Sequence, residues 1–207
     1  MFVKTLAPKN KLLLHKLSDV SWLKDFYLAG GTALALQYGH RQSIDLDWFT
    51  LKPIAIAPLL KRLATIAPIE VLNRATDTLE GIVADVKVSF MTYPYRLLIK
   101  PIRWEGVTLA APLDIAIMKL GAIADRNTRK DFIDLYLFLK REPMALSLLI
   151  TQAEKKFAPA RYDRYHLCKS LTYFAEADAE AMPKMLLPLD WKTVRKFFIQ
   201  EVKKLTR

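Results

Sequence analysis

The stretch LAGGTALALQYGHRQSIDLDWF, residues 28–49, decides how the N-terminal half of this chain is interpreted. It contains a glycine pair at Gly30–Gly31, a basic turn at His40–Arg41, and two acids, Asp45 and Asp47, that are separated by one residue. Glycine lets backbone N–H groups approach a ligand closely, and a helix N-terminus favours phosphate. A glycine pair by itself is also explained by a tight turn, so the flanking residues must decide.

The flanking residues predict a strand, a helix and a second strand. We expect a short strand over Tyr27–Ala29, a helix over Thr32–Tyr38 with Thr32 as its N-cap, and a stop at Gly39. The second strand is expected over Ser43–Thr50. Its period of two places Ile44, Leu46 and Trp48 on one face and Ser43, Asp45, Asp47 and Phe49 on the other.

The two acids of this strand allow two interpretations. Residues i and i+2 of a strand share a face about 6.6 Å apart, so two carboxylates there repel each other unless a cation lies between them. Mg²⁺ commonly binds through one or two carboxylates together with substrate phosphates, so Asp45 and Asp47 could hold a metal–nucleotide. Alternatively, they line a solvated strand face.

The remaining sequence divides near residue 111. Before it, we expect helices over Lys11–Phe26 and Ile56–Ile66 and a strand meander over Glu70–Tyr95. After it, the periodicity is helical through LDIAIMKLGAIADR and DFIDLYLFLK. Further helices are expected over Ala145–Phe157, Arg161–Ala177 and Trp191–Leu205. The chain therefore reads as an α/β half, residues 1–111, followed by a helical half, residues 112–207.

Composition narrows the class of protein. The net charge is +11, from 32 basic and 21 acidic residues, which suits a polyanionic partner such as RNA, DNA or an anionic membrane surface. No run of about 18 apolar residues predicts a membrane span, and the N-terminus lacks the apolar core of a signal peptide. Cys168 is the only cysteine, which excludes an intrachain disulfide framework and fits a reducing cytoplasm.

Two segments resemble a known family. GGTALALQYGHRQSIDLDWF, residues 30–49, and LDIAIMKLGAIADRNTRKDFIDLY, residues 113–136, resemble nucleotidyltransferases with a DNA polymerase β-type fold, and within them the AbiEii/AbiGii toxin family. The resemblance implies an α+β fold, with a polymerase β-like mixed sheet and flanking helices followed by an α-helical C-terminal half. It further implies that the helical region completes the active site.

The resemblance also implies roles for individual residues. In the first segment, catalysis and metal binding fall to Asp45 and Asp47, and nucleotide binding to Gly30, Gly31, Thr32, Arg41 and Ser43. In the second segment, catalytic roles fall to Lys119, Asp131 and Asp134, and nucleotide binding to Lys119, Arg126 and Lys130. The implied cofactor is Mg²⁺ (or Mn²⁺), with a nucleoside triphosphate as substrate.

The second segment also has structural interpretations. Lys119 lies on an apolar helix face, so it either snorkels to the surface or reaches into a site. Asp131 and Asp134 share a helix face; Asp131 could simply favour the helix N-terminus, and Lys130 could pair with Asp134 at i,i+4. The functional interpretation is that one of these acids orients Lys119 or Arg126, or acts as a base.

The sequence departs from the family pattern at one position. Enzymes of this fold usually carry a third acid on a neighbouring strand, where DVKVSFMTYPY places Ser89. Asp85 would share the face of Ser89 four residues away, and a bulge or shifted register could bring it closer. Serine cannot act as a carboxylate base, so this position raises the question of activity.

The resemblance implies a cytoplasmic, metal-dependent toxin of an abortive infection or toxin–antitoxin pair. It would transfer a nucleoside monophosphate to an acceptor hydroxyl, with RNA or tRNA as the expected acceptor, a separate antitoxin protein as partner and no membrane. The alternatives are a degenerate module that binds nucleotide or RNA without chemistry, or a transferase that acts on a protein or small molecule.

Overall fold

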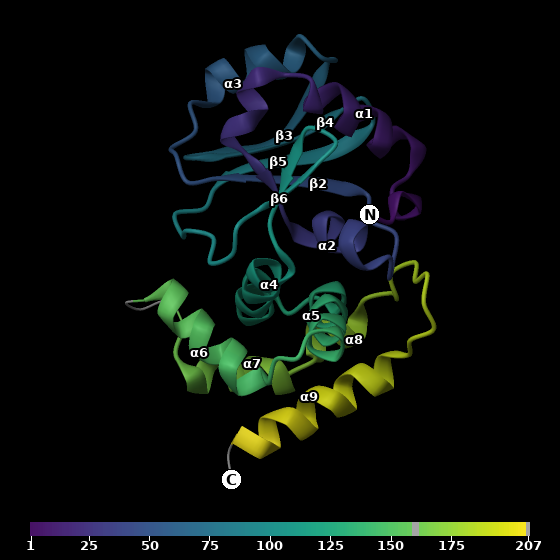
Figure 1. The fold of residues 1–207 in the computed structure, drawn as a ribbon, viewed down its shortest axis with the longest axis vertical. Coiled ribbons are helices and arrows are strands. Elements are labelled where there is room, and N and C mark those ends of the chain that lie inside the picture. The colour runs from purple at the N-terminus through teal and green to yellow at the C-terminus, as the bar shows by residue number, and fades with distance from the viewer. Residues whose placement is uncertain (159–161, 206–207) are drawn as a thin grey trace. The chain divides into compact units, whose positions relative to one another are not determined.

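The computed structural model describes residues 1–158 and 162–205 (Figure 1). The chain forms two compact units, Met1–Ala111 and Pro112–Arg207. The first unit contains the glycine pair and both acids of the opening stretch, and the second contains Lys119 and the two helical acids. Each unit is described separately.

The first unit is built on a seven-stranded mixed sheet with the order β3-β4-β5-β2-β1-β7-β6. Its strands are β1 (Tyr27–Leu28), β2 (Asp45–Thr50), β3 (Ile69–Ala75), β4 (Thr78–Val83), β5 (Val86–Thr92), β6 (Ile102–Trp104) and β7 (Val107–Leu109). β2 pairs in parallel with β5, and β1 in parallel with β7, whereas the other neighbouring strands are antiparallel. β3 to β5 are the predicted meander.

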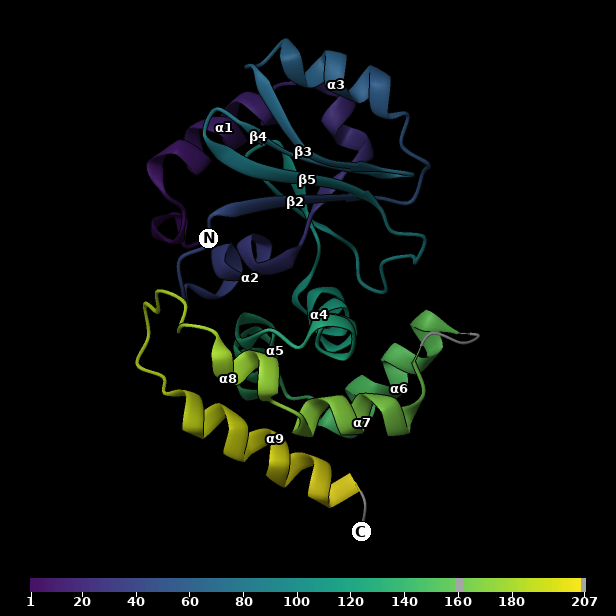
Figure 2. The ribbon, with the colours of Figure 1, turned by 180° about the vertical axis from the view of Figure 1, so that it is seen from behind.

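Helices lie on both sides of this sheet. They are the 3-10 helices η1 (Val3–Thr5) and η2 (Ser21–Asp25) and the α-helices α1 (Pro8–Ser18), α2 (Gly30–Tyr38) and α3 (Ile56–Ala64). Figures 1 and 2 show α1 and α3 on one side of the sheet and α2 on the other. The acidic strand β2 lies in the middle of the sheet.

The alternation of β2 separates its core face from its acidic face. Leu46 and Trp48 are fully buried, and Trp48 stacks on Phe90 of β5 with 6.3 Å between ring centroids. Phe26, just after η2, adds an edge contact to Phe90 at 5.2 Å. Asp45 and Asp47 point to the other face and are only partly buried, so the predicted division of the strand is confirmed from Asp45 onward.

Two local predictions in this unit need correction, and a third is confirmed. The predicted helix over Lys11–Phe26 is wrong, because α1 ends at Ser18 and a separate 3-10 helix, η2, follows Val20. Thr32 is not an N-cap, because α2 begins two residues earlier, with Ala29 at the cap position. Gly39 does end α2, in the left-handed conformation with φ 68°, as expected.

The second unit is helical. Its helices are α4 (Pro112–Arg126), α5 (Arg129–Arg141), α6 (Leu146–Phe157), α7 (Arg164–Thr172), α8 (Ala175–Ala179) and α9 (Trp191–Leu205). α4 contacts α5, α6 and α7, whereas α9 packs on α5 and α7 (Figure 2). Phe132 of α5 packs against Phe198 of α9 with 5.4 Å between ring centroids.

Of the predicted C-terminal helices, the last has the expected buried face, and the one before it is divided in two. Val194 and Phe198 of α9 are fully buried, which confirms the apolar face predicted for Trp191–Leu205. The predicted helix over Arg161–Ala177 is wrong as a single element, because α7 ends at Thr172 and α8 begins at Ala175. Arg161, where that prediction begins, lies outside the described residues.

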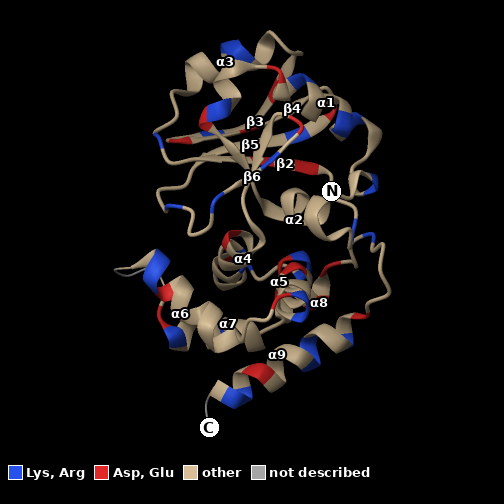
Figure 3. Ribbon diagram, in the orientation of Figure 1, with Lys and Arg blue, Asp and Glu red and all other residues tan. Residues whose placement is uncertain are grey.

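Figure 3 shows Lys and Arg residues on both units, with several along α9. Among the residues that the structure describes, no helix combines the length and apolar character needed to cross a membrane.

Candidate functional site

The turn between β1 and α2 brings Gly30 against Asp47. The Ala29 N–H donates to the Asp47 carbonyl oxygen at 3.0 Å, which fixes the start of α2 beside β2. Gly30 has φ +64°, and a Cβ atom built on it would lie 2.5 Å from Asp47 Oδ2. Only glycine satisfies both conditions, because any side chain would be strained and would displace the carboxylate.

Gly31 makes room for Arg41 in the same way. A Cβ atom on Gly31 would lie 2.1 Å from Arg41 Nη2 and 3.4 Å from Ser43 Oγ. The guanidinium therefore lies directly against the first turn of α2. Arg41 is 4% exposed, and its Nη1 donates to the Gln42 carbonyl oxygen at 3.1 Å. A cation and the N-terminal end of a helix are thus held next to each other, and both favour an anion.

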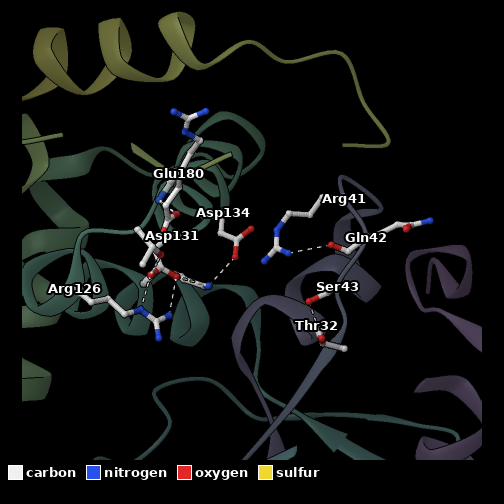
Figure 4. Close-up of polar contacts among 11 residues, drawn as sticks. Thr32, Arg41, Gln42, Ser43, Arg126, Asp131, Asp134 and Glu180 are labelled. Carbon is white, nitrogen blue, oxygen red and sulfur yellow. Dashed lines mark hydrogen bonds and ion pairs between the residues drawn. The ribbon is translucent and has the colours of Figure 1, made fainter. Parts of the chain in front are cut away.

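Thr32 and Ser43 join α2 to the start of β2. The Thr32 hydroxyl donates to the Asp45 carbonyl oxygen and shares a hydrogen bond of 2.8 Å with the Ser43 hydroxyl (Figure 4). Both residues are buried. The structure therefore brings together the seven residues that the first segment predicts: Gly30, Gly31, Thr32, Arg41, Ser43, Asp45 and Asp47.

The strand register places Ser89 beside Asp47. In the parallel pair of β2 and β5, Asp45 faces Lys87 and Asp47 faces Ser89. Asp85 does not belong to this face, because it lies in the turn between β4 and β5 with φ 61°, where its carbonyl oxygen accepts a hydrogen bond from Lys9. The expectation that Asp85 could approach by a bulge is therefore wrong, since β5 begins only at Val86.

The acids of this face fit a metal that binds through substrate oxygens. Within residues 1–158 and 162–205, no three His, Cys, Asp or Glu side chains are grouped so that they could hold a metal ion. Asp45 and Asp47 provide carboxylate oxygens, which suit Mg²⁺ when phosphate oxygens and waters complete its coordination. A metal held by the protein alone does not fit this arrangement.

The second unit contains a buried ion-pair cluster around Lys119. Its Nζ lies 2.7 Å from Asp131 Oδ1 and 2.8 Å from Asp134 Oδ2. Arg126 Nε donates to Asp131 Oδ2 at 2.9 Å, and the Thr128 hydroxyl donates to the same oxygen at 2.6 Å (Figure 4). Lys119 is 4% exposed and both acids are fully buried. Lys119 therefore does not snorkel; it is held between two carboxylates.

Charge pairing determines the ionisation of Asp131. Burial by itself would raise the pKa of this carboxyl, but the Lys119 ammonium and the Arg126 guanidinium outweigh burial and hold the pKa well below its usual value. Asp131 is consequently an anion that positions two cations. Lys130 is half-buried and lies outside the cluster, so the predicted i,i+4 pair with Asp134 is not formed.

Three residues near the predicted sites were missed. Thr128 precedes α5 and binds Asp131, and Lys87 lies beside Asp45. Glu80 of β4 faces Ser89 across the antiparallel pair of β4 and β5. The alternation of Thr78, Glu80 and Ile82 in TLEGIV is visible in the sequence, but the register that aligns Glu80 with Ser89 is not.

The mixed sheet, the glycine turn and the acidic strand define the nucleotidyltransferase fold, and solved structures agree. The chain is similar to a putative nucleotidyltransferase from Helicobacter pylori, with a TM-score of 0.55 and 22% identity over 96% of this chain and 95% of that chain. It is also similar to MenT4, the nucleotidyltransferase toxin Rv2826c of Mycobacterium tuberculosis H37Rv, with a TM-score of 0.55 and 12% identity over 93% and 82% of the two chains. These likenesses show the fold.

The sequence comparisons show the family. Residues 11–98 match the model of the nucleotidyl transferase AbiEii toxin of type IV toxin–antitoxin systems. An uncharacterized protein of Aquifex aeolicus (strain VF5), aq_aa25, is 34% identical over 205 residues, which cover 97% of this chain and 98% of that protein. The chain belongs to the AbiEii nucleotidyltransferase toxin family, and this membership supports nucleotidyl transfer as its general activity and an antitoxin as a partner.

Proposed function

We propose that this chain is the metal-dependent toxin of a toxin–antitoxin pair, which transfers a nucleoside monophosphate from a triphosphate to an acceptor hydroxyl and releases pyrophosphate. The observation that carries the proposal is the double glycine. Gly30 admits the Asp47 carboxylate and Gly31 admits the Arg41 guanidinium at the start of one helix. This arrangement supports phosphate binding at the start of α2, next to an acid that would hold the metal.

The triphosphate binds at the start of α2. The backbone N–H groups of the first turn and the Arg41 guanidinium act together on phosphate oxygens. Thr32 and Ser43 hold this turn against β2 through their shared hydrogen bond. Because Arg41 is already buried and fixed, little side-chain entropy is lost when phosphate binds.

Asp45 and Asp47 would hold Mg²⁺ or Mn²⁺ together with the phosphate oxygens of the substrate. When bound, such an ion neutralises phosphate charge and lowers the pKa of an attacking hydroxyl. Gly30 allows the Asp47 carboxylate to lie against the turn, because a Cβ atom at this position would displace it.

Lys119 contributes positive charge to the same reaction, as the family resemblance implies. Asp131 and Asp134 orient its ammonium group through two ion pairs. Arg126, which is paired with Asp131, and the half-buried Lys130 add positive charge from the same pair of helices.

RNA, and tRNA in particular, is the proposed acceptor. The net charge of +11 supports a polyanionic acceptor, because basic residues release condensed counterions when they bind a phosphate backbone. A separate antitoxin protein would restrain the activity in the cytoplasm.

The test is a labelling reaction with the purified chain, Mg²⁺, total tRNA and each α-labelled nucleoside triphosphate in turn. Label on RNA is expected with the unaltered chain and should be lost in Asp45→Asn and Asp47→Asn. Asp85→Asn is the matched control, because Asp85 lies in an exposed turn away from the acidic face. Unchanged labelling in Asp45→Asn and Asp47→Asn would contradict a metal-dependent reaction.

A second candidate function follows from Ser89. A serine beside Asp47 is also expected in a degenerate module that binds nucleotide or RNA without chemistry. Triphosphate binding without label on any acceptor would support that function. Label on protein or on a small molecule would instead support nucleotidyl transfer to an acceptor other than RNA.

A further inference from the structure

Five side chains form a continuous polar face around Ser89, which we call the Ser89 face: Asp45, Asp47, Lys87, Ser89 and Glu80. One row across the sheet runs from Asp47 of β2 through Ser89 of β5 to Glu80 of β4. The neighbouring row contains Asp45 and Lys87. Because residues that are paired in register point to the same side of a sheet, all five project from one face.

The spacing of this row sets how far apart its two acids lie. Strands are about 4.8 Å apart, so Glu80 and Asp47 lie about 10 Å apart at their Cα atoms. The serine side chain between them is short and buried. Glutamate is one methylene longer than aspartate, so the Glu80 carboxylate can reach from β4 toward the acidic face that Asp47 shares.

Lys87 pairs with Glu80 on this face. Its Nζ lies 4.0 Å from Glu80 Oε2, and the two side chains are 48% and 32% exposed. Glu80 is therefore supported but remains accessible to a substrate. On this face of β4 and β5, Glu80 is the one acidic residue. The other residues of the two strands on this face are Thr78, Ile82, Lys87, Ser89 and Met91.

We propose that Glu80 is the base that takes the proton from the acceptor hydroxyl, because Ser89 supplies no carboxylate between Glu80 and Asp47. The inference rests on the proposed nucleotidyl transfer and names the residue on its acceptor side. The acceptor O–H proton passes to the Glu80 carboxylate, the oxygen forms a bond to the α-phosphorus, and the bond from that phosphorus to the bridging oxygen breaks. Pyrophosphate leaves with the electron pair of that bond.

The first test measures the initial rate of tRNA labelling in Glu80→Gln. Loss of a general base lowers rates by about 10²–10⁴-fold, and we expect a decrease in kcat of this size with unchanged triphosphate binding. Glu70→Gln is the matched control, because Glu70 faces Ile82 on the same side of the sheet, one strand farther from Asp47. A base role also predicts that the acidic limb of the pH–rate profile disappears in Glu80→Gln, which a structural role alone would not cause.

The second test moves the carboxylate by one strand. Ser89→Asp in the Glu80→Gln background places an acid beside Asp47 and should restore part of the lost rate. Glu80→Asp keeps the charge and withdraws the carboxylate by one methylene, so it should lower kcat without changing the melting temperature; this variant decides the question if Glu80→Gln folds poorly.

The outcomes separate this inference from the proposed function. If the unaltered chain labels no acceptor, nucleotidyl transfer itself fails. If the unaltered chain labels tRNA and both Glu80→Gln and Glu80→Asp label it at the same rate, only the assignment of Glu80 is overturned.

Discussion

Gly31 and Arg41 fit together without room for a methyl group: a Cβ atom on Gly31 would lie 2.1 Å from Arg41 Nη2. The two residues are ten positions apart and come from the start of α2 and from the segment before β2. Arg41 is buried, so its guanidinium is oriented before any ligand arrives. Gly30 has the same relation to Asp47, and the glycine pair thereby positions one cation and one anion.

Gly31→Ala should weaken triphosphate binding by about 10–100-fold, because it displaces a guanidinium whose charged hydrogen bonds contribute about 1.5–3 kcal/mol. Helix propensity cannot explain such a loss, since alanine is the better helix former. Calorimetric titration with a non-hydrolysable triphosphate measures the effect. Gln42→Ala is the control in the same turn, because it keeps the carbonyl that accepts from Arg41. In an Arg41→Ala background, Gly31→Ala should have little further effect, and a full additional loss would contradict the coupling.

The stability of the helical unit should fall in acid through Asp131. The pKa of its carboxyl is lower in the folded chain than the value of 3.8 expected when unfolded. Its stabilising contribution is therefore complete above about pH 4 and is lost as the pH falls toward the folded value. Urea unfolding from pH 7 down to pH 2 should show this decrease, and Asp131→Asn should be less stable at pH 7 and less sensitive below pH 4. The control Asp19→Asn, at an exposed position, should keep the acid sensitivity; an Asp131→Asn chain with unaltered sensitivity would rule out this origin.

A second buried ion pair, Lys156 with Asp114, should behave as a unit. Lys156 Nζ lies 2.5 Å from Asp114 Oδ1, with side chains 1% and 0% exposed. Lys156→Met leaves a buried carboxylate and should cost about 3–5 kcal/mol in the free energy of unfolding. The double variant Asp114→Leu/Lys156→Met should lose clearly less free energy of unfolding than the two single variants lose together. Strict additivity in urea unfolding would show that the two charges do not interact.

RNA affinity should fall steeply with salt, and α9 should contribute to the slope. Its apolar face is buried, and Lys192 and Lys196 lie on its exposed side. Removing two phosphate contacts with Lys192→Gln/Lys196→Gln should reduce the slope of log affinity against log salt by about 2. Lys11→Gln/Lys16→Gln on α1 is the matched control, since it removes the same charge from another exposed helix. If the two double variants reduce the slope of log affinity against log salt equally, the reduction reflects net charge and not a contact made by α9.

Much of the fold was predictable because its signals are local. The alternation in IDLDW predicts which residues of β2 are buried, and Gly39 predicts the end of α2. The resemblance to the AbiEii family and the mixed sheet with flanking helices are confirmed. The single helix predicted over Lys11–Phe26 is wrong because the helical spacing of Leu13 and Leu17 continues to Val20, whereas the helix itself ends before Asp19. Trp22 and Phe26, which follow this break, pack on Phe90.

The candidate site was predictable only as a set of residues. Spacing identified Gly30, Gly31, Asp45 and Asp47, because glycine turns and strand periodicity are properties of short segments. Spacing did not explain why glycine is required at each position, because the requirement comes from the side chains of Asp47 in β2 and of Arg41 before it. The same holds for Lys119, whose position on an apolar face left its partners open until α4 and α5 were seen to pack together.

The sequence by itself determined the family, the acidic strand and the change from an α/β half to a helical half, because periodicity, glycine and charge act over a few residues. Only the tertiary structure decided that Arg41 lies over Gly31, that Lys119 is shared by Asp131 and Asp134, and that Glu80 aligns with Ser89 and Asp47. These relationships depend on strand register and helix packing. Both are set by the sum of many contacts between distant residues, and no short stretch of sequence contains that sum.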